Sequence, residues 1–226
     1  MSIWSRITDA LSALAKGESL SDVFAYLRTQ PERSAGFAIA VIALGAKMAK
    51  ADGQVTRDEV SAFREVFHIP PDEEKNAARL FNLARTDVAG FELYAQKVAA
   101  MFGPADPALC DLMEGLFHIA TADGEYHPAE DEYLKNVAKI FGLPPRKFAA
   151  LRSRLVPDAH PDPYAVLGVT PDMALNDIRA VWRNEVRESH PDRMVARGVP
   201  QEAVKMAEKR LIAVNRAWDE ISRERA

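Results

Sequence analysis

A histidine and an aspartate separated by one proline stand in the last third of this 226-residue chain, as His190-Pro191-Asp192. A His–Asp pair can act as a general base when the carboxylate accepts a hydrogen bond from the imidazole. The sequence indicates neither a nucleophile nor a substrate pocket beside this pair, so we expect no enzyme activity from it. Pro191 excludes the helical conformation for His190, which predicts a loop that presents both side chains to another protein. A purely structural loop, in which Asp192 caps and His190 packs, is the alternative.

The same tripeptide occurs thirty residues earlier, as His160-Pro161-Asp162. This copy lies in a proline-rich stretch, residues 157–162, which cannot continue a helix. No basic helix precedes it. We therefore predict a linker at residues 157–162 and assign no function to the earlier copy.

A row of arginines precedes the later copy. Arg179, Arg183 and Arg187 recur at four-residue steps in a segment whose apolar spacing predicts a helix over residues 176–189. A second helix is predicted over residues 201–222. Two such helices would form an antiparallel hairpin, with His190 and Asp192 in the connecting loop.

Two acidic pairs with the same spacing occupy a repeated turn: Asp52 with Glu59, and Asp123 with Glu130. Each turn contains Ala-Asp-Gly between two predicted helices, so residues 34–155 contain a helix-turn-helix repeat. If the repeats pack symmetrically, the four carboxylates can gather into a metal or partner site. Alternatively, they are turn and cap residues that stabilise helix N-termini. An EF-hand is excluded, because the glycine stands at loop position two instead of six.

The elements that must position these residues are all helices. Apolar residues recur at intervals of three and four almost throughout, and alternating strand patterns are absent, which predicts an all-α fold. A net charge of -4 argues against a general nucleic-acid-binding protein. The one cysteine, Cys110, lies in an apolar run and is predicted to be a buried core residue in a reducing compartment.

No segment predicts a signal peptide or a membrane-spanning helix. The most apolar stretch, residues 35–49, is interrupted by Lys47 and is shorter than the roughly 20 residues that a spanning helix needs. Residues 1–30 are predicted to form N-terminal amphipathic helices, of which we expect the first to pack on the body of the protein. Peripheral contact of this helix with the inner membrane is the alternative. We expect a cytoplasmic protein.

Residues 31–156 resemble the TerB-like family, an all-helical bundle found in tellurite-resistance proteins. The resemblance rests on the paired Ala-Asp-Gly turns and on the glutamate seven residues after each aspartate. It implies the fold, and the family's acidic clusters are suspected of binding metal. A metal- or stress-sensing adaptor is therefore the alternative function for this chain.

Residues 163–226 resemble the J-domain of DnaJ-type co-chaperones. The resemblance is carried by residues 164–169, 178–183 and 215–218, and by His190-Pro191-Asp192. A TerB-like segment followed by a J-domain is similar to the DjlA branch. This resemblance implies a co-chaperone that stimulates the ATPase of a DnaK-type chaperone, with no cofactor and no catalytic residue of its own. The residues implied to contact the chaperone are Arg179, Trp182, Arg183, Arg187, His190, Pro191, Asp192 and Arg193.

Glu185 departs from the family pattern, which has an apolar core residue at this position. Two interpretations are open: an ion pair with an arginine of the hairpin, or weaker helix packing. The TerB-like segment is expected to serve targeting, client choice or self-association. Client proteins and a second copy of the chain are therefore further expected partners.

Overall fold

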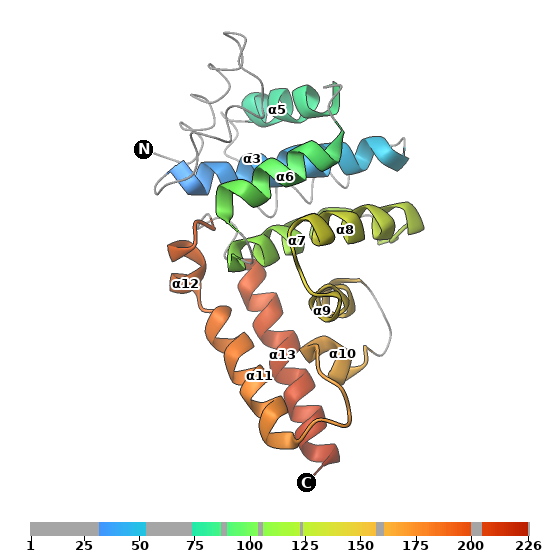
Figure 1. The fold of residues 1–226 in the computed structure, drawn as a ribbon, viewed down its shortest axis with the longest axis vertical. Helices are drawn as coiled ribbons and strands as arrows, with labels where there is room; N and C mark the ends of the chain where they lie inside the picture. The colour runs from blue at the N-terminus through green and yellow to red at the C-terminus, as the bar shows by residue number, and fades with distance from the viewer. Residues whose placement is uncertain are drawn as a thin grey trace.

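The computed structural model describes residues 32–52, 74–86, 90–103, 106–122, 124–156, 161–199 and 205–225. Within these ranges all regular structure is helical, which confirms the predicted all-α fold. The upper body in Figure 1 contains α3 (Glu32–Asp52), α5 (Glu74–Thr86), α6 (Phe91–Phe102), α7 (Pro107–Ala120), α8 (Pro128–Ile140) and α9 (Pro145–Leu155). The remaining helices are α10 (Pro163–Leu167), α11 (Leu175–Glu188), α12 (Pro191–Ala196) and α13 (Lys205–Glu224); in Figure 1, α11 and α13 extend downward from α7, and α12 lies at the left near the level of α9.

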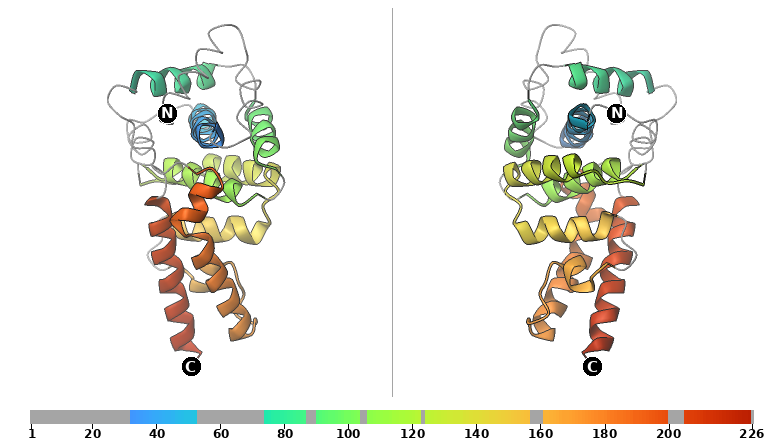
Figure 2. Two further views of the ribbon diagram at one scale, coloured as in Figure 1. Left: turned by 90° about the vertical axis from the view of Figure 1, so that its left-hand side faces the viewer. Right: turned by 90° about the vertical axis from the view of Figure 1, so that its right-hand side faces the viewer.

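Helix α3 is the centre of the upper body. Figure 2 shows it end-on, with α5, α6 and the layer of α7 and α8 around it. Its residues from Phe37 to Leu44 are at most 1% exposed. A helix that is apolar on all sides is buried on all sides, so the most apolar stretch of the sequence forms a core helix. Among the helices described, none is long and apolar enough to cross a membrane.

Helices α7 and α8 are held tightly against α3. Gly45 on α3 leaves room for α7, because a Cβ at this position would lie 3.1 Å from Ile119 Cδ1. The Tyr133 hydroxyl of α8 donates a 2.8 Å hydrogen bond to the Leu44 carbonyl of α3. These contacts fix the position of α7, which faces the lower part of the molecule.

The hairpin of α11 and α13 has an apolar cluster of its own. Trp182 stacks on Trp218 with ring centroids 5.2 Å apart, and its Nε1 donates to Asn215 Oδ1 at 2.9 Å. Helix α10 lies against both α13 and α9. It ends at Gly168, which adopts the left-handed conformation typical of a helix C-cap (φ 68°).

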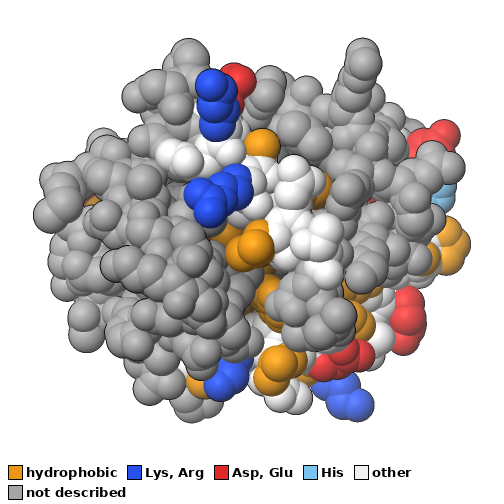
Figure 3. Space-filling model, turned by 90° about the horizontal axis from the view of Figure 1, so that it is seen from above, with side chains coloured by type: hydrophobic (Ala, Val, Ile, Leu, Met, Phe, Trp, Pro, Cys, Tyr) orange, Lys and Arg blue, Asp and Glu red, His pale blue; other side chains and the backbone are white. Residues whose placement is uncertain are grey.

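The predicted boundaries can be compared with these helices only where the chain is described. Helix α11 agrees with the helix predicted over residues 176–189, and α13 runs to Glu224. The predicted N-terminal helices, the linker residues 157–160 and residues 201–204 lie outside the described residues. On the face seen from above (Figure 3), apolar, basic and acidic side chains of the described residues are interspersed.

Candidate functional site

The outward face of α11 carries the predicted arginine row. Arg179, Arg183 and Arg187 are exposed, whereas Ile178 and Glu185 on the same helix are buried. Residues four apart share one side of a helix. The three guanidinium groups therefore form one basic strip on the solvent side of α11.

His190 follows directly after this strip. Its backbone is extended (φ -66°, ψ 131°), as predicted from Pro191, and it is the N-cap residue of α12. Its Nδ1 accepts a hydrogen bond of 3.2 Å from the backbone N–H of Asp192. The side chains of His190 and Asp192 are 61% and 92% exposed, so both are open to a partner.

The predicted loop around Asp192 is corrected in one respect. Residues from Pro191 to Ala196 form the short helix α12, so Asp192 stands in the first helical turn rather than in a loop. Pro191 has the fixed φ that suits a first helical position, which explains this helix start. The distance from Asp192 Oδ2 to His190 Nδ1 is 3.7 Å, too long for the hydrogen bond of a general-base pair.

Arg193 and Trp182 are less available than the basic strip. Arg193 forms an ion pair with Glu188, although half of its side chain remains exposed. Trp182 is half-buried by its stacking on Trp218. It holds α11 against α13, and the predicted contact of Trp182 with a chaperone stays a prediction.

Glu185 faces the upper body rather than another residue of the hairpin. It forms ion pairs with Lys147 and with Arg154, both on α9, and Arg154 Nη2 lies 3.1 Å from Glu185 Oε2 without hydrogen-bond geometry. Burial alone would raise the pKa of Glu185, but the charges of Arg154 and Lys147 outweigh this effect and lower its pKa. The predicted pairing within the hairpin is therefore wrong: the ion pairs join the hairpin to the upper body.

A second set of buried ion pairs joins the two parts through α7. Arg210 of α13 donates to Asp111 at 2.6 Å and to Glu114 at 2.5 and 2.7 Å. Arg197, just after α12, donates to Asp111 at 2.8 and 3.2 Å. Burial alone would lower the pKa of Arg210, but the carboxylates of Glu114 and Asp111 raise it well above its usual value. Two carboxylates of α7 thus lie opposite two guanidinium groups, and this set of four residues is called the Arg210 cluster.

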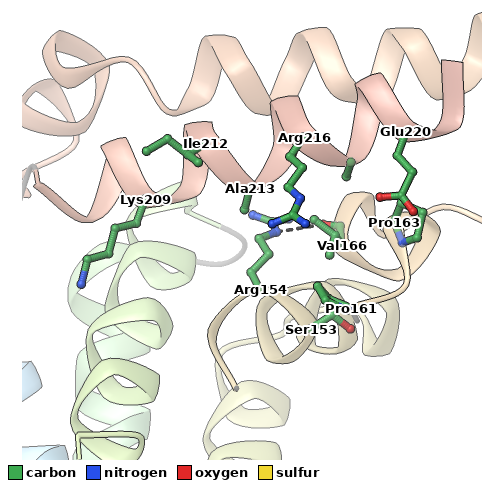
Figure 4. A pocket seen from close by; sticks show the side chains of 11 residues that line it. Ser153, Arg154, Pro161, Pro163, Val166, Lys209, Ile212, Ala213, Arg216 and Glu220 are labelled. Atoms are coloured by element: carbon green, nitrogen blue, oxygen red, sulfur yellow. Dashed lines mark hydrogen bonds between the residues drawn. The ribbon is translucent and has the colours of Figure 1, made fainter. Parts of the chain in front are cut away.

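A groove remains open along the seam between α9, α10 and α13 (Figure 4). Its volume is about 290 Å³, and Arg154, Arg216 and Glu220 are among its lining residues. Arg154 Nε donates to the Val166 carbonyl at 2.9 Å, as the dashed line in Figure 4 shows. The Arg154 side chain is therefore held by two contacts, a hydrogen bond to α10 and an ion pair with Glu185 of α11.

The acidic turns are described only in part. Glu130 Oε2 accepts a hydrogen bond of 2.9 Å from the His127 backbone N–H, which is the predicted capping contact. Glu59 and Asp123, and the side chain of Asp52, lie outside the described residues. In the part of the chain that is described, no group of three or more His, Cys, Asp or Glu side chains could hold a metal ion. The metal site stays a prediction.

Similarity to known proteins supports both halves of this arrangement. The family model for tellurite resistance protein TerB matches residues 38–153, which is more than half of the chain. The chain belongs to the TerB family. In this TerB-family chain, the matched region comprises most of the upper body, from α3 to α9. No solved structure matches the chain significantly.

Curated relatives of this TerB-family chain carry the name co-chaperone protein DjlA. The relative from Photobacterium profundum is 27% identical over 86% of this chain and 79% of its own length. Those from Aliivibrio fischeri and Vibrio cholerae are 25% and 23% identical, each over 87% of this chain and 81% of the relative. Residues 1–162 make up less than 86% of the chain, so the similarity extends into residues 163–226. The predicted similarity to DjlA-type co-chaperones is confirmed.

The contacts between the hairpin and the upper body were not predicted from the sequence. Their signal was a charged residue at positions where helical spacing calls for an apolar one. Asp111 and Glu114 interrupt the apolar residues of α7, and Arg210 stands near Ala207 and Val214 in the buried part of α13. Buried charges of opposite sign on two helices indicate that the helices meet.

Proposed function

We propose that this chain is a co-chaperone that stimulates the ATPase of a DnaK-type chaperone, with residues 163–226 acting as its J-domain. The hydrolysed ATP belongs to the chaperone. In this proposal the chain contributes a contact surface and no catalytic group. The curated relatives named as DjlA co-chaperones support the assignment.

The observation that carries the proposal is the two-sided character of α11. Its outer side presents Arg179, Arg183 and Arg187, and the strip leads to the exposed His190 and Asp192. Its inner side is held through Glu185 to α9. Contact with the upper body therefore leaves the proposed chaperone-binding surface open to solvent.

The basic strip gives the proposed interaction an electrostatic character. Three exposed arginines at four-residue spacing attract an acidic surface and steer its approach. The contact is screened by salt, because exposed charges interact weakly beyond a Debye length of about 8 Å at physiological ionic strength. The contact at His190 and Asp192 would then bias the chaperone toward its hydrolysing state, which is an allosteric coupling between two proteins.

The upper body has a different role in the proposal. As a TerB-family bundle it would serve targeting, client choice or self-association, while the hairpin addresses the chaperone. Client proteins and a second copy of the chain are the partners that this role implies.

The proposal is tested by ATP hydrolysis of a DnaK-type chaperone with the full-length chain. Wild type is expected to stimulate hydrolysis in a concentration-dependent way. His190→Gln should abolish this stimulation and keep the helical content, because the His190 side chain is mostly exposed. No stimulation by wild type, or full stimulation by His190→Gln, would contradict the proposal.

A matched pair of arginine variants tests the basic strip. Arg183→Ala should raise the concentration needed for half-maximal stimulation several-fold, and the difference should shrink between about 0.05 and 0.3 M salt as charges are screened. Arg216→Ala, at another exposed arginine on α13 outside the strip, is the control. Equal effects of the two substitutions would show that the strip has no special role.

A further inference from the structure

The segment that carries His190 is anchored in the core of the upper body. Met194 on α12 and Val199 after it are 0% exposed, and Ala207 at the start of α13 is 2% exposed. All three side chains belong to the apolar cluster of the upper body, not to that of the hairpin. The connection between α11 and α13 thus packs on a different domain from the helices that it connects.

Buried ion pairs also anchor this segment and the beginning of α13 to the upper body. Asp111 of α7 has a fully buried side chain and accepts hydrogen bonds from both Arg197 and Arg210. Arg197 directly follows α12, and Arg210 lies in the second turn of α13. One carboxylate of the upper body therefore holds the chain at two points, directly after α12 and near the start of α13.

A chain of contacts leads from Asp111 to the exposed pair. Arg197 also donates from Nη2 to the Glu188 carbonyl at 2.9 Å and from Nη1 to Glu188 Oε2 at 3.3 Å. Glu188 forms an ion pair with Arg193 as well. Glu188 and Arg193 stand on either side of His190 and Asp192, so the contacts enclose the turn that presents them.

Helix α12 needs such external support. It has six residues, and a helix of this length is unstable by itself because nucleation costs more than so few hydrogen bonds return. Its backbone hydrogen bonds are local: the Met194 N–H donates to the His190 carbonyl, and the Val199 N–H donates to the Met194 carbonyl. Contacts with α7 and the upper-body core therefore decide whether α12 keeps this conformation.

We propose that Asp111 is a positioning residue: acting through Arg197, the TerB-family bundle fixes the orientation of His190 and Asp192 for the partner chaperone. Part of this inference rests on the proposed function, namely that the orientation is used to stimulate the chaperone. The other part, that Asp111 orders the segment from His190 to Val199, concerns this chain alone and is tested without any partner.

Amide hydrogen exchange of the full-length chain tests the second part. Asp111→Asn should accelerate exchange of the Arg197, Gly198 and Val199 amides at least about tenfold, and leave amides of α8 unchanged. Asp219→Asn, the same substitution at an exposed position of α13, is the control. Unchanged exchange at residues 197–199 in Asp111→Asn would overturn the inference.

A second variant covers the case in which Asp111→Asn loosens the whole upper body. Arg197→Met leaves the α7 carboxylates with Arg210 and should accelerate the same three amides, with α8 again unaffected. If Asp111 acts through Arg197, adding Asp111→Asn to Arg197→Met accelerates those amides no further. No acceleration in Arg197→Met, or a fully additive effect in the double variant, would refute the pathway.

The chaperone assay separates positioning from docking. Asp111→Asn should lower the maximal stimulation of ATP hydrolysis several-fold and leave the half-maximal concentration unchanged, because the basic strip stays in place. Arg183→Ala should raise the half-maximal concentration several-fold and leave the maximal stimulation unchanged. An unchanged maximum in Asp111→Asn overturns the functional part. If wild type does not stimulate at all, the proposed function fails, and the exchange data still decide the structural part.

Discussion

Removing the carboxylate of Glu185 should weaken the contact between hairpin and upper body by a calculable amount. Glu185→Gln leaves the Arg154 guanidinium buried, with 3% of its side chain exposed and no carboxylate opposite. Breaking a buried ion pair from one side costs about 3–5 kcal/mol. Arg154 keeps its bond to Val166, and the Lys147 side chain is 34% exposed and can turn to water. The lower end of the range, about 3 kcal/mol, is therefore expected.

Urea unfolding at two pH values measures this cost. With a slope of about 2 kcal/mol/M, a loss of 3 kcal/mol shifts the midpoint by about 1.5 M at pH 7. The pKa of Glu185 is lowered in the folded chain, so its stabilisation is present above the ordinary carboxyl pKa and is lost as the pH falls through the folded pKa. The difference between wild type and Glu185→Gln should therefore narrow as the pH falls below the ordinary carboxyl pKa.

Two further variants make the reasoning refutable. Glu208→Gln, at an exposed position of α13, should leave the midpoint within about 0.3 M of wild type. Replacing both charges, as Glu185→Leu with Arg154→Met, should recover most of the loss, since an apolar pair of similar volume is often as stable as a buried ion pair. A midpoint of Glu185→Gln equal to that of wild type at pH 7, or a difference independent of pH, would refute the ion-pair account.

Two more predictions concern single side chains. Trp182→Phe removes the hydrogen bond to Asn215 and the indole stacking on Trp218, so it should cost about 1–2 kcal/mol in urea unfolding and reduce the near-ultraviolet circular dichroism; an unchanged spectrum would contradict the stacking. Cys110 is only partly buried rather than a core residue as predicted, yet desolvation raises the pKa of its thiol to about 11, so at pH 8 a disulfide reagent should react about two orders of magnitude more slowly with the native chain than with the urea-unfolded chain; equal rates would contradict this desolvation.

Much of the fold follows from local patterns in the sequence. The all-round apolar stretch of α3, the stop at Gly168 and the arginine spacing on α11 each need only neighbouring residues to be recognised. The common side of the three arginines and the extended backbone of His190 follow from local patterns as well. A four-residue step and a following proline each involve only neighbouring residues.

The contacts between the two parts depend on residues far apart in the chain. Glu185 pairs with a lysine 38 positions away, and Arg210 meets Asp111 from 99 positions away. No periodicity connects such residues, and for Glu185 the sequence left open an ion pair with an arginine of the hairpin or weaker helix packing. The start of α12 at Pro191 was missed for a different reason, because proline ends one helix and also suits the first position of the next.

Because of the Asp111 carboxylate, the hairpin cannot readily be replaced by the corresponding hairpin of another protein. A hairpin transplanted from another co-chaperone would bring its own residues to the positions of Arg197 and Arg210, and α7 would then keep an unpaired charge in its interior. A chimera joined within the linker would therefore separate residues that depend on each other. Replacement of the hairpin would have to include α7, so the segment to exchange in engineering extends beyond residues 163–226.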